Sequence, residues 1–249
     1  MIFYFTATGN SKYIADKIAA AIGDTAINIT ACVQIGQFSF EIEDGETVGF
    51  VVPVYGYGIP LIVSEFLDKL TISADHNYYS YAILNCGGST GDAERYIKQA
   101  FNLDAVFGIF TVNNYVPLSK IVSETKINEQ LDKADIEINK FIERINARES
   151  GNFNTVKGML PNFLTPVIYS IFKQMLKTSK FSVSDKCSGC GLCETLCPRE
   201  VIERVNKKPT WIKPECELCL ACLHRCPVSA IEYGRSAGRG RYVNPRVEW

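Results

Sequence analysis

Eight of the ten cysteines fall in two runs that share one spacing, and thiols at this density are suited to binding metal. In each run three cysteines follow at steps of three, and a fourth comes four residues later, directly before a proline. Zinc sites use pairs of ligands separated by a longer gap, and a secreted disulfide fold spreads its cysteines through the core that it cross-links. The spacing therefore favours a polynuclear metal cluster for each run. The runs are Cys187-Ser-Gly-Cys190-Gly-Leu-Cys193-Glu-Thr-Leu-Cys197-Pro198 and Cys216-Glu-Leu-Cys219-Leu-Ala-Cys222-Leu-His-Arg-Cys226-Pro227.

This repeated spacing is similar to that of the bacterial two-cluster ferredoxins, in which the fourth cysteine of each run ligates the cluster of the other run. The resemblance implies two [4Fe–4S] clusters. Cluster one would be held by Cys187, Cys190, Cys193 and Cys226. Cluster two would be held by Cys216, Cys219, Cys222 and Cys197.

The same resemblance implies the local structure around the cysteines. Residues 201–211 would form a short hairpin, with Val201 and Ile202 paired to Ile231 and Tyr233. Gly189 and Gly191 would leave room for a cluster and free N–H groups for its sulfur atoms. His224 is not needed as a ligand, and we expect a surface residue or a donor to sulfur.

A polar segment near the N-terminus has the composition of an anion site. Thr6-Ala7-Thr8-Gly9-Asn10-Ser11 follows an apolar strand over residues 1–5 and precedes a helix over residues 10–22. Free backbone N–H groups and the dipole at a helix start favour an anion, and the hydroxyls add donors. A plain helix cap would explain Thr8 or Asn10 alone. The segment lacks the lysine of a nucleoside-triphosphate loop and the glycines of a dinucleotide fingerprint, so a phosphate site of another kind is predicted.

Two further loops follow apolar strands. In Pro53-Val54-Tyr55-Gly56-Tyr57-Gly58 an aromatic ring can lie against a flat ligand while the glycines present backbone groups to its edge. A turn with surface tyrosines is the alternative. The other loop, Asn85-Cys86-Gly87-Gly88-Ser89-Thr90-Gly91, suits close backbone contact with a ligand.

The elements that must position these loops alternate between strand and helix over the first 150 residues. Such alternation predicts an α/β fold with a doubly wound, five-stranded parallel sheet covered by helices on both faces. Ligands of these sheets bind at the carboxyl ends of the strands, where all three loops begin. Strands are expected at residues 1–5, 25–29, 47–54, 78–85 and 105–112, and helices at 10–22, 61–70, 93–101 and 124–148.

These three loops on this alternation resemble flavodoxin. The resemblance implies FMN, with its phosphate on Thr6, Ala7, Thr8, Gly9, Asn10 and Ser11. One side of the isoalloxazine would be lined by Pro53, Val54, Tyr55, Gly56, Tyr57 and Gly58, and the other by Asn85, Cys86, Gly87, Gly88 and Ser89. Cys86 could tune the flavin, but we favour a small buried apolar residue, and Cys32 and His76 receive no role.

Composition places limits on the class of protein. The 249 residues are 47% apolar and 21% charged with a net charge of −1, which excludes a disordered chain and a generally basic nucleic-acid binder. No signal peptide and no apolar run long enough to span a bilayer occurs, so the cytoplasm is the expected location. The charge is divided unevenly, at −8 for residues 1–150 and +7 for residues 151–249.

That division supports two domains. We expect a flavodoxin-like FMN domain at residues 1–150, an apolar and partly helical linker at 151–180, a small α+β ferredoxin domain at 181–235 and a basic tail at 236–249. The linker would pack between the domains, with a membrane-surface segment as the alternative. The tail would be disordered, or would dock on an acidic partner such as the first domain.

The whole chain resembles the flavodoxin–ferredoxin fusion proteins of anaerobic bacteria and archaea. That resemblance implies electron transfer between two [4Fe–4S] clusters, FMN and an external redox carrier or reductase. Two alternatives stay open: an oxidoreductase that reduces its own small organic substrate, such as a quinone, at FMN, and an oxygen sensor in which the clusters control partner binding.

Overall fold

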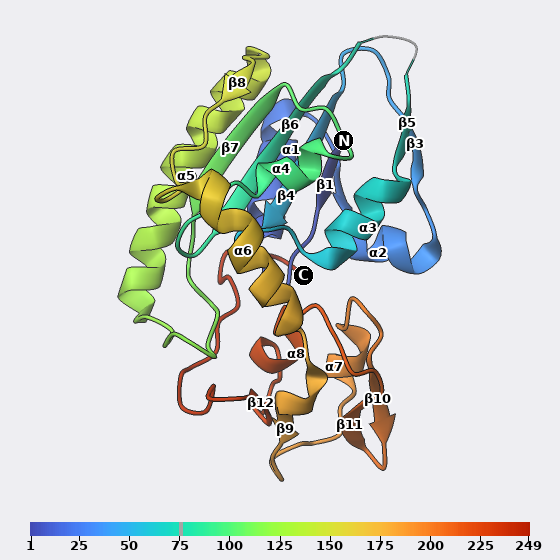
Figure 1. The fold of residues 1–249 in the computed structure, drawn as a ribbon, viewed down its shortest axis with the longest axis vertical. Coiled ribbons are helices and arrows are strands. Elements are labelled where there is room, and N and C mark those ends of the chain that lie inside the picture. Colours follow the sequence, from blue (N-terminus) through green and yellow to red (C-terminus); the bar gives the residue numbers. More distant parts are fainter. Residues whose placement is uncertain (75–76) are drawn as a thin grey trace.

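The chain folds around a six-stranded parallel sheet that lies above a smaller, cysteine-rich part (Figure 1). The computed structural model describes residues 1–74 and 77–249, so His76 lies outside the described residues. The sheet has the order β2-β1-β4-β6-β7-β8. Its first five strands reproduce the predicted elements, in the 2-1-3-4-5 order of flavodoxin-like folds, and the predicted fold class is confirmed. The six strands are β1 Ile2–Tyr4, β2 Ala26–Asn28, β4 Thr47–Pro53, β6 Tyr79–Cys86, β7 Ala105–Phe110 and β8 Gly151–Asn152.

Helices cover both faces of the sheet because its central strands are apolar on both sides. On one face α1 and α5 pack against alternate residues such as Ile2, Ile83 and Phe107. On the other face α2, α3 and α4 pack against the intervening residues, among them Phe3 and Phe50. The helices are α1 Asn10–Ile22, α2 Ile29–Ile35, α3 Leu61–Lys69, α4 Glu94–Lys98 and α5 Glu124–Asn146.

Four short elements of the part that contains the sheet were not expected from the sequence. α2 continues directly from β2, and its N-terminus is capped by Asn28, whose side chain accepts from the N–H of Thr30 at 2.8 Å. β3 Ser39–Glu41 and β5 Thr71–Ser73 pair with each other away from the main sheet. β8 extends the sheet edge over two residues that were assigned to the linker. Segments this short carry too little periodicity to be recognised.

The cysteine-rich part consists of two antiparallel strand pairs and two short helices. β10 Ile202–Val205 and β11 Lys208–Trp211 form the predicted hairpin, closed by Asn206 and Lys207 at positive φ, as a tight two-residue turn requires. The predicted pairing of Val201 and Ile202 with Ile231 and Tyr233 is wrong. β12 Ile231–Tyr233 instead pairs with β9 Phe181–Val183, because the linker leads into an apolar strand that the prediction overlooked. The short helices are α7 Leu192–Thr195 and α8 Ala221–His224.

A helix, α6 Pro161–Gln174, connects the two parts and runs from the sheet toward α7 and α8 (Figure 1). Pro161 is the first residue of α6, where a missing N–H leaves no helical hydrogen bond unmade. Pro166 lies inside the helix, which nevertheless runs without a break where only a partly helical linker was expected. Tyr169 is buried and donates from its hydroxyl to the carbonyl of Ile59 at 2.6 Å. Phe163, in contrast, is 83% exposed. Only one side of α6 therefore packs between the two parts, and η1 Thr178–Lys180 follows it.

The remaining features concern the membrane and the tail. No helix among the described residues is long and apolar enough to cross a bilayer. The C-terminal segment returns to the sheet and is held on α5, where Arg246 pairs with Asp132 at 2.6 Å and Asp135 at 2.9 Å. Of the two expectations for the tail, docking on the acidic first part is the one that the structure bears out.

Candidate cofactor sites

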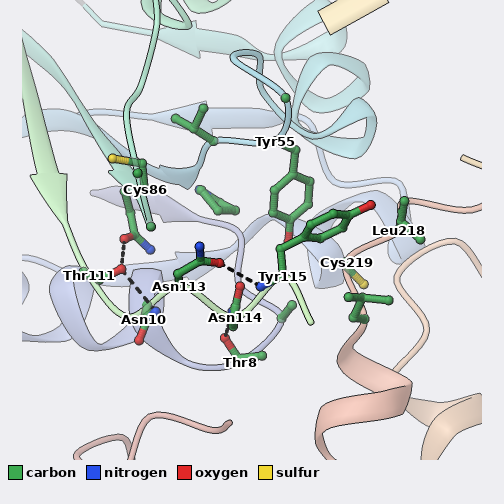
Figure 2. Close-up of a pocket in the computed structure, with 18 of the residues that line it drawn as sticks. Thr8, Asn10, Tyr55, Cys86, Thr111, Asn113, Asn114, Tyr115, Leu218 and Cys219 are labelled. Atoms are coloured by element: carbon green, nitrogen blue, oxygen red, sulfur yellow. Dashed lines mark hydrogen bonds between the residues drawn. The ribbon is translucent and has the colours of Figure 1, made fainter. Parts of the chain in front are cut away.

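A cavity of about 600 Å³ opens at the carboxyl ends of β1, β4, β6 and β7 (Figure 2). All three predicted loops contribute to its lining, as expected from strands whose ends meet at one edge of a sheet. Of the predicted flavin residues only Gly9 and Gly58 do not line it. The lining includes Thr6, Ala7, Thr8, Asn10, Ser11, Pro53, Val54, Tyr55, Gly56, Tyr57, Asn85, Cys86, Gly87, Gly88 and Ser89.

The first loop lies at the N-terminus of α1, a helix of 13 residues. Gly9 has a φ of 101°, a conformation that a side chain would strain, and its N–H donates to the hydroxyl of Thr6 at 3.0 Å. Asn10 is buried, and its amide donates to the Thr111 hydroxyl at 3.2 Å. Hydroxyls and the start of a helix can bind an anion here, whereas the Asn10 amide is already engaged within the protein.

The second loop is a tight turn against α6. Tyr55 and Gly58 exchange backbone hydrogen bonds of 2.8 and 3.0 Å, and the two residues between them, Gly56 and Tyr57, have φ of 57° and 66°. A Cβ on Gly58 would lie 2.3 Å from the ring of Tyr169. The close approach of α6, and not of a ligand, therefore requires glycine at position 58, contrary to the sequence interpretation.

Tyr55 points from this turn into the cavity, between the loop that carries Cys86 and the cysteine Cys219 (Figure 2). Burial raises the pKa of the Tyr55 phenol well above its usual value of 10.0, so this side chain is a neutral ring. Tyr57 takes another direction, and its phenol oxygen accepts a hydrogen bond of 2.8 Å from the hydroxyl of Ser89. Of the two tyrosines of this loop, Tyr55 is thus the one available to a ligand, and Tyr57 joins the second loop to the third.

The third loop approaches the backbone after β7. A Cβ on Gly87 would lie 2.6 Å from Cα of Asn113, so a close chain crossing requires glycine there. Cys86 is buried at the end of β6, and burial raises the pKa of its thiol to about 11. A thiol with that pKa is protonated at neutral pH, which agrees with an apolar role for Cys86.

Two groups of lining residues were missed by the sequence analysis. The segment after β7 contributes Asn113, Asn114 and Tyr115, and its paired asparagines directly after a strand are a signal that could have been used. The other group is apolar and comes from distant parts of the chain, so no local pattern marks it. It comprises Leu118, Ile168, Ile171, Phe172, Met175, Leu218 and Leu220.

The eight clustered cysteines line two separate cavities in the sets that the resemblance implied. One cavity has Cys187, Cys190, Cys193 and Cys226 on its wall. The other has Cys197, Cys216, Cys219 and Cys222. All ten cysteines are free of disulfides, and among residues 1–74 and 77–249 no three His, Cys, Asp or Glu side chains form a site for a single metal ion.

Backbone N–H groups also point at cysteine sulfurs in this part. Val201, Leu218 and Ala230 donate to Cys197, Cys216 and Cys226 at 3.4, 3.2 and 3.2 Å. An iron–sulfur cluster is bound by four cysteine sulfurs around one cavity, with backbone N–H groups that donate to sulfur. The residues present therefore fit two such clusters.

The second cysteine cavity adjoins the cavity at the sheet. Cys219, Leu218 and Leu220 line both of them. Beside them Glu217 is buried, and its carboxylate accepts from the N–H groups of Leu61 and Ile62 at 2.9 and 2.7 Å, which caps the start of α3. A residue between Cys216 and Cys219 thus fixes the cysteine-rich part to the sheet.

His224 makes a second connection between the two parts. It is buried, its Nδ1 accepts from the N–H of Tyr242 at 3.2 Å, and its Nε2 lies 2.8 Å from the carbonyl oxygen of Asn114. Burial lowers the pKa of His224 to about 4, so the ring is neutral and Nε2 donates to Asn114. The expectation of a surface residue or a donor to sulfur is wrong, because the side chain faces the sheet.

Comparisons with known proteins agree with both halves of this geometry. The family model described as flavodoxin domain matches residues 1–108, and the one described as 4Fe-4S dicluster domain matches residues 186–231. The chain joins a flavodoxin domain to a 4Fe-4S dicluster domain. These two domains support a redox, electron-transfer role with flavin and iron–sulfur cofactors.

Among individual proteins, an uncharacterized polyferredoxin-like protein of Methanocaldococcus jannaschii is 38% identical over 77 residues, 30% of this chain. The match spans only 27% of that relative's length. Among solved structures, an azoreductase from Bacillus anthracis str. Sterne matches 57% of this chain and 95% of its own at 12% identity. Its TM-score is 0.30, a likeness that carries no argument.

Proposed function

We propose that this chain relays electrons between an external redox carrier, two [4Fe–4S] clusters and FMN. The observation that carries the proposal is the position of Cys219, which lines both the flavin cavity and the second cysteine cavity. A cluster on Cys197, Cys216, Cys219 and Cys222 would therefore lie next to a flavin. The flavin handles one or two electrons and a cluster handles one, so the pair can exchange single electrons when bound.

The residues toward the flavin divide into three groups. Thr6, Thr8, Ser11 and the start of α1 would hold the phosphate. Tyr55 would contact one side of the isoalloxazine, and the loop of Gly87, Gly88 and Ser89 the other. A cavity of about 600 Å³ falls within the 300–1,000 Å³ typical of sites for molecules of this size.

The order of the relay follows from exposure. Cys190, which would hold cluster one, is exposed, whereas Cys222, which would hold cluster two, is buried. The exposed cluster would exchange electrons with the external carrier, and the buried cluster would pass them to FMN. The hydrogen bonds of Glu217 to α3 and of His224 to Asn114 would keep the distance between cluster two and FMN fixed.

Anaerobic purification with cofactor analysis tests the proposal. We expect about eight iron ions, about eight sulfide ions and one FMN per chain. The first two numbers follow because each [4Fe–4S] cluster holds four iron and four sulfide ions. Dithionite should then reduce the clusters, as seen by EPR, and the flavin, as seen by its absorbance. Iron near zero, or a chain that releases no flavin on denaturation, contradicts the proposal.

A second candidate is reduction of a small organic substrate at FMN. The observation in its favour is the apolar wall that Ile168, Ile171, Phe172 and Met175 give to the cavity. Steady-state turnover with a panel of quinones and nitro compounds separates the two candidates. Fast exchange with ferredoxins and no organic turnover favours the relay, and fast organic turnover favours the second candidate.

A further inference from the structure

The C-terminal segment lies across the loop proposed to bind the FMN phosphate. The N–H of Asn244 donates to the carbonyl of Thr8 at 2.8 Å. A Cβ on Gly9 would lie 2.8 Å from Val247 and 3.1 Å from Cβ of Asn244. The glycine of the first loop is thus required by contact with the tail, and its backbone faces the last residues of the chain.

Two tail side chains determine how Asn10 is oriented. The carbonyl oxygen of the Asn10 amide accepts from the hydroxyl of Tyr242 at 2.6 Å and from the amide of Asn244 at 3.1 Å. Its amino group therefore faces β7, where it donates to Thr111 at 3.2 Å. Asn10, Tyr242 and Asn244 are all at least nine-tenths buried. Asn10 is the first residue of α1, so these bonds fix the start of the helix.

The tail is itself anchored on both domains. Arg246 pairs with Asp132 and Asp135 of α5. The guanidinium of Arg225, beside the cluster cysteine Cys226, lies 3.5 Å from the ring centroid of Trp249. His224 is also connected to the first loop, through Asn114. The carbonyl of Asn114 accepts from the His224 ring, and the side-chain amide of Asn114 donates to the Thr8 hydroxyl at 2.6 Å.

We propose that Tyr242 and Asn244 are positioning residues of the flavin phosphate site, although they lie outside the flavodoxin domain. Backbone N–H groups bind an anion well only when they are already oriented, since ordering a loop upon binding costs free energy. The tail supplies this order by bonding Thr8 and Asn10 from the outside. This inference rests on the proposed binding of FMN and adds that both ends of the chain form the site.

The test compares FMN with riboflavin, which lacks the phosphate. Dissociation constants are measured by flavin fluorescence on the cluster-loaded full chain, for the wild type and for Tyr242→Phe and Asn244→Ala. We expect each substitution to weaken FMN about tenfold, the effect of losing one buried hydrogen bond, and to leave riboflavin unchanged. The matched control is Tyr79→Phe, which removes a hydroxyl bond to the carbonyl of Glu149 (2.7 Å) at the opposite end of the sheet, and it should change neither constant.

The other outcomes are decisive as well. Unchanged FMN affinity in both tail variants overturns the inference, and so does an equal loss for FMN and riboflavin, because a general loss of structure does not select for phosphate. If the wild type binds neither flavin, the proposed function fails instead. Riboflavin bound at wild-type strength by a variant shows that its cavity has folded.

Discussion

At the scale of single residues, the site depends on groups whose burial determines their chemistry. Tyr55 is held neutral by burial, and the His224 ring is neutral with its proton on Nε2. Neither group is suited to proton transfer near pH 7, where a pKa close to the working pH is needed. Tyr55 and His224 therefore have structural roles, and neither supplies a proton in a reaction.

The buried thiol of Cys86 should be unreactive at mildly alkaline pH. Because burial raises its pKa to about 11, the reactive thiolate is scarce at pH 8 and becomes abundant only as the pH approaches that value. We expect no alkylation of Cys86 by iodoacetamide at pH 8 in the native, cluster-loaded chain. Peptide mass spectrometry measures the modification, with urea-unfolded chain as the control in which Cys86 reacts. Fast labelling of the native chain at pH 8 contradicts the buried, protonated state.

At the scale of elements, α6 shapes the cavity at the sheet through its contacts with the turn after β4. The rings of Tyr169 and Phe172 lie so close to Gly58 and Gly56 that these positions have no room for a side chain. These contacts hold the turn in place, and Tyr55 points from it into the cavity (Figure 2). A connecting helix thus acts as part of the site.

A pair of glycine substitutions tests this packing. Gly58→Ala places a Cβ 2.3 Å from the Tyr169 ring, and we expect it to lower the free energy of unfolding by roughly 1–3 kcal/mol, the usual cost of overpacking. Gly88→Ala is the control, because a Cβ there meets nothing within 4 Å. Urea denaturation of both variants measures the difference. Equal stabilities show that α6 does not press on the turn.

Elements were predicted from sequence where the signal was local. The start and end of α1 follow from apolar spacing closed by Gly23, and β4 and β6 follow from continuous apolar runs. The pairing of β12 with β9 was missed because strand pairing depends on the three-dimensional fold. The sequence of neither strand indicates which strand it pairs with. The same holds for the tail at the phosphate loop and for α6 behind the turn, since each contact joins segments far apart in the chain.

At the scale of the whole molecule, the two domains are joined at the place where electrons would pass between them. Glu217 lies between Cys216 and Cys219 and caps α3, while Arg199, next to the Cys197-Pro198 pair, bonds to Glu65 of the same helix at 2.5 Å. The opposite charges of the two halves support this docking, though exposed ion pairs each contribute at most about 1 kcal/mol. The buried cap of Glu217 is therefore the stronger contact.

The relay order gives a prediction for the whole chain. Cys219→Ala should remove cluster two, lower the iron content from about eight to about four per chain, and leave FMN bound. Reduction of the flavin by a reduced ferredoxin should then slow at least tenfold in stopped-flow absorbance, because the cluster beside the flavin is gone. Cys32→Ala, at a buried cysteine outside both cluster cavities, is the control and should keep all the iron. Flavin reduction at the wild-type rate in the Cys219 variant contradicts the order.

The hydrogen bonds between Asn10 and the tail have a consequence for how the protein is made. Asn10 and Asn244 are 234 residues apart, so a ribosome synthesises all the residues between them before the two can meet. The first loop therefore lacks these partners until the segment that carries Asn244 has left the ribosome. Folding of the N-terminal domain during translation thus leaves the start of α1 without two of the hydrogen bonds that orient it, and these bonds form in a later, separate step.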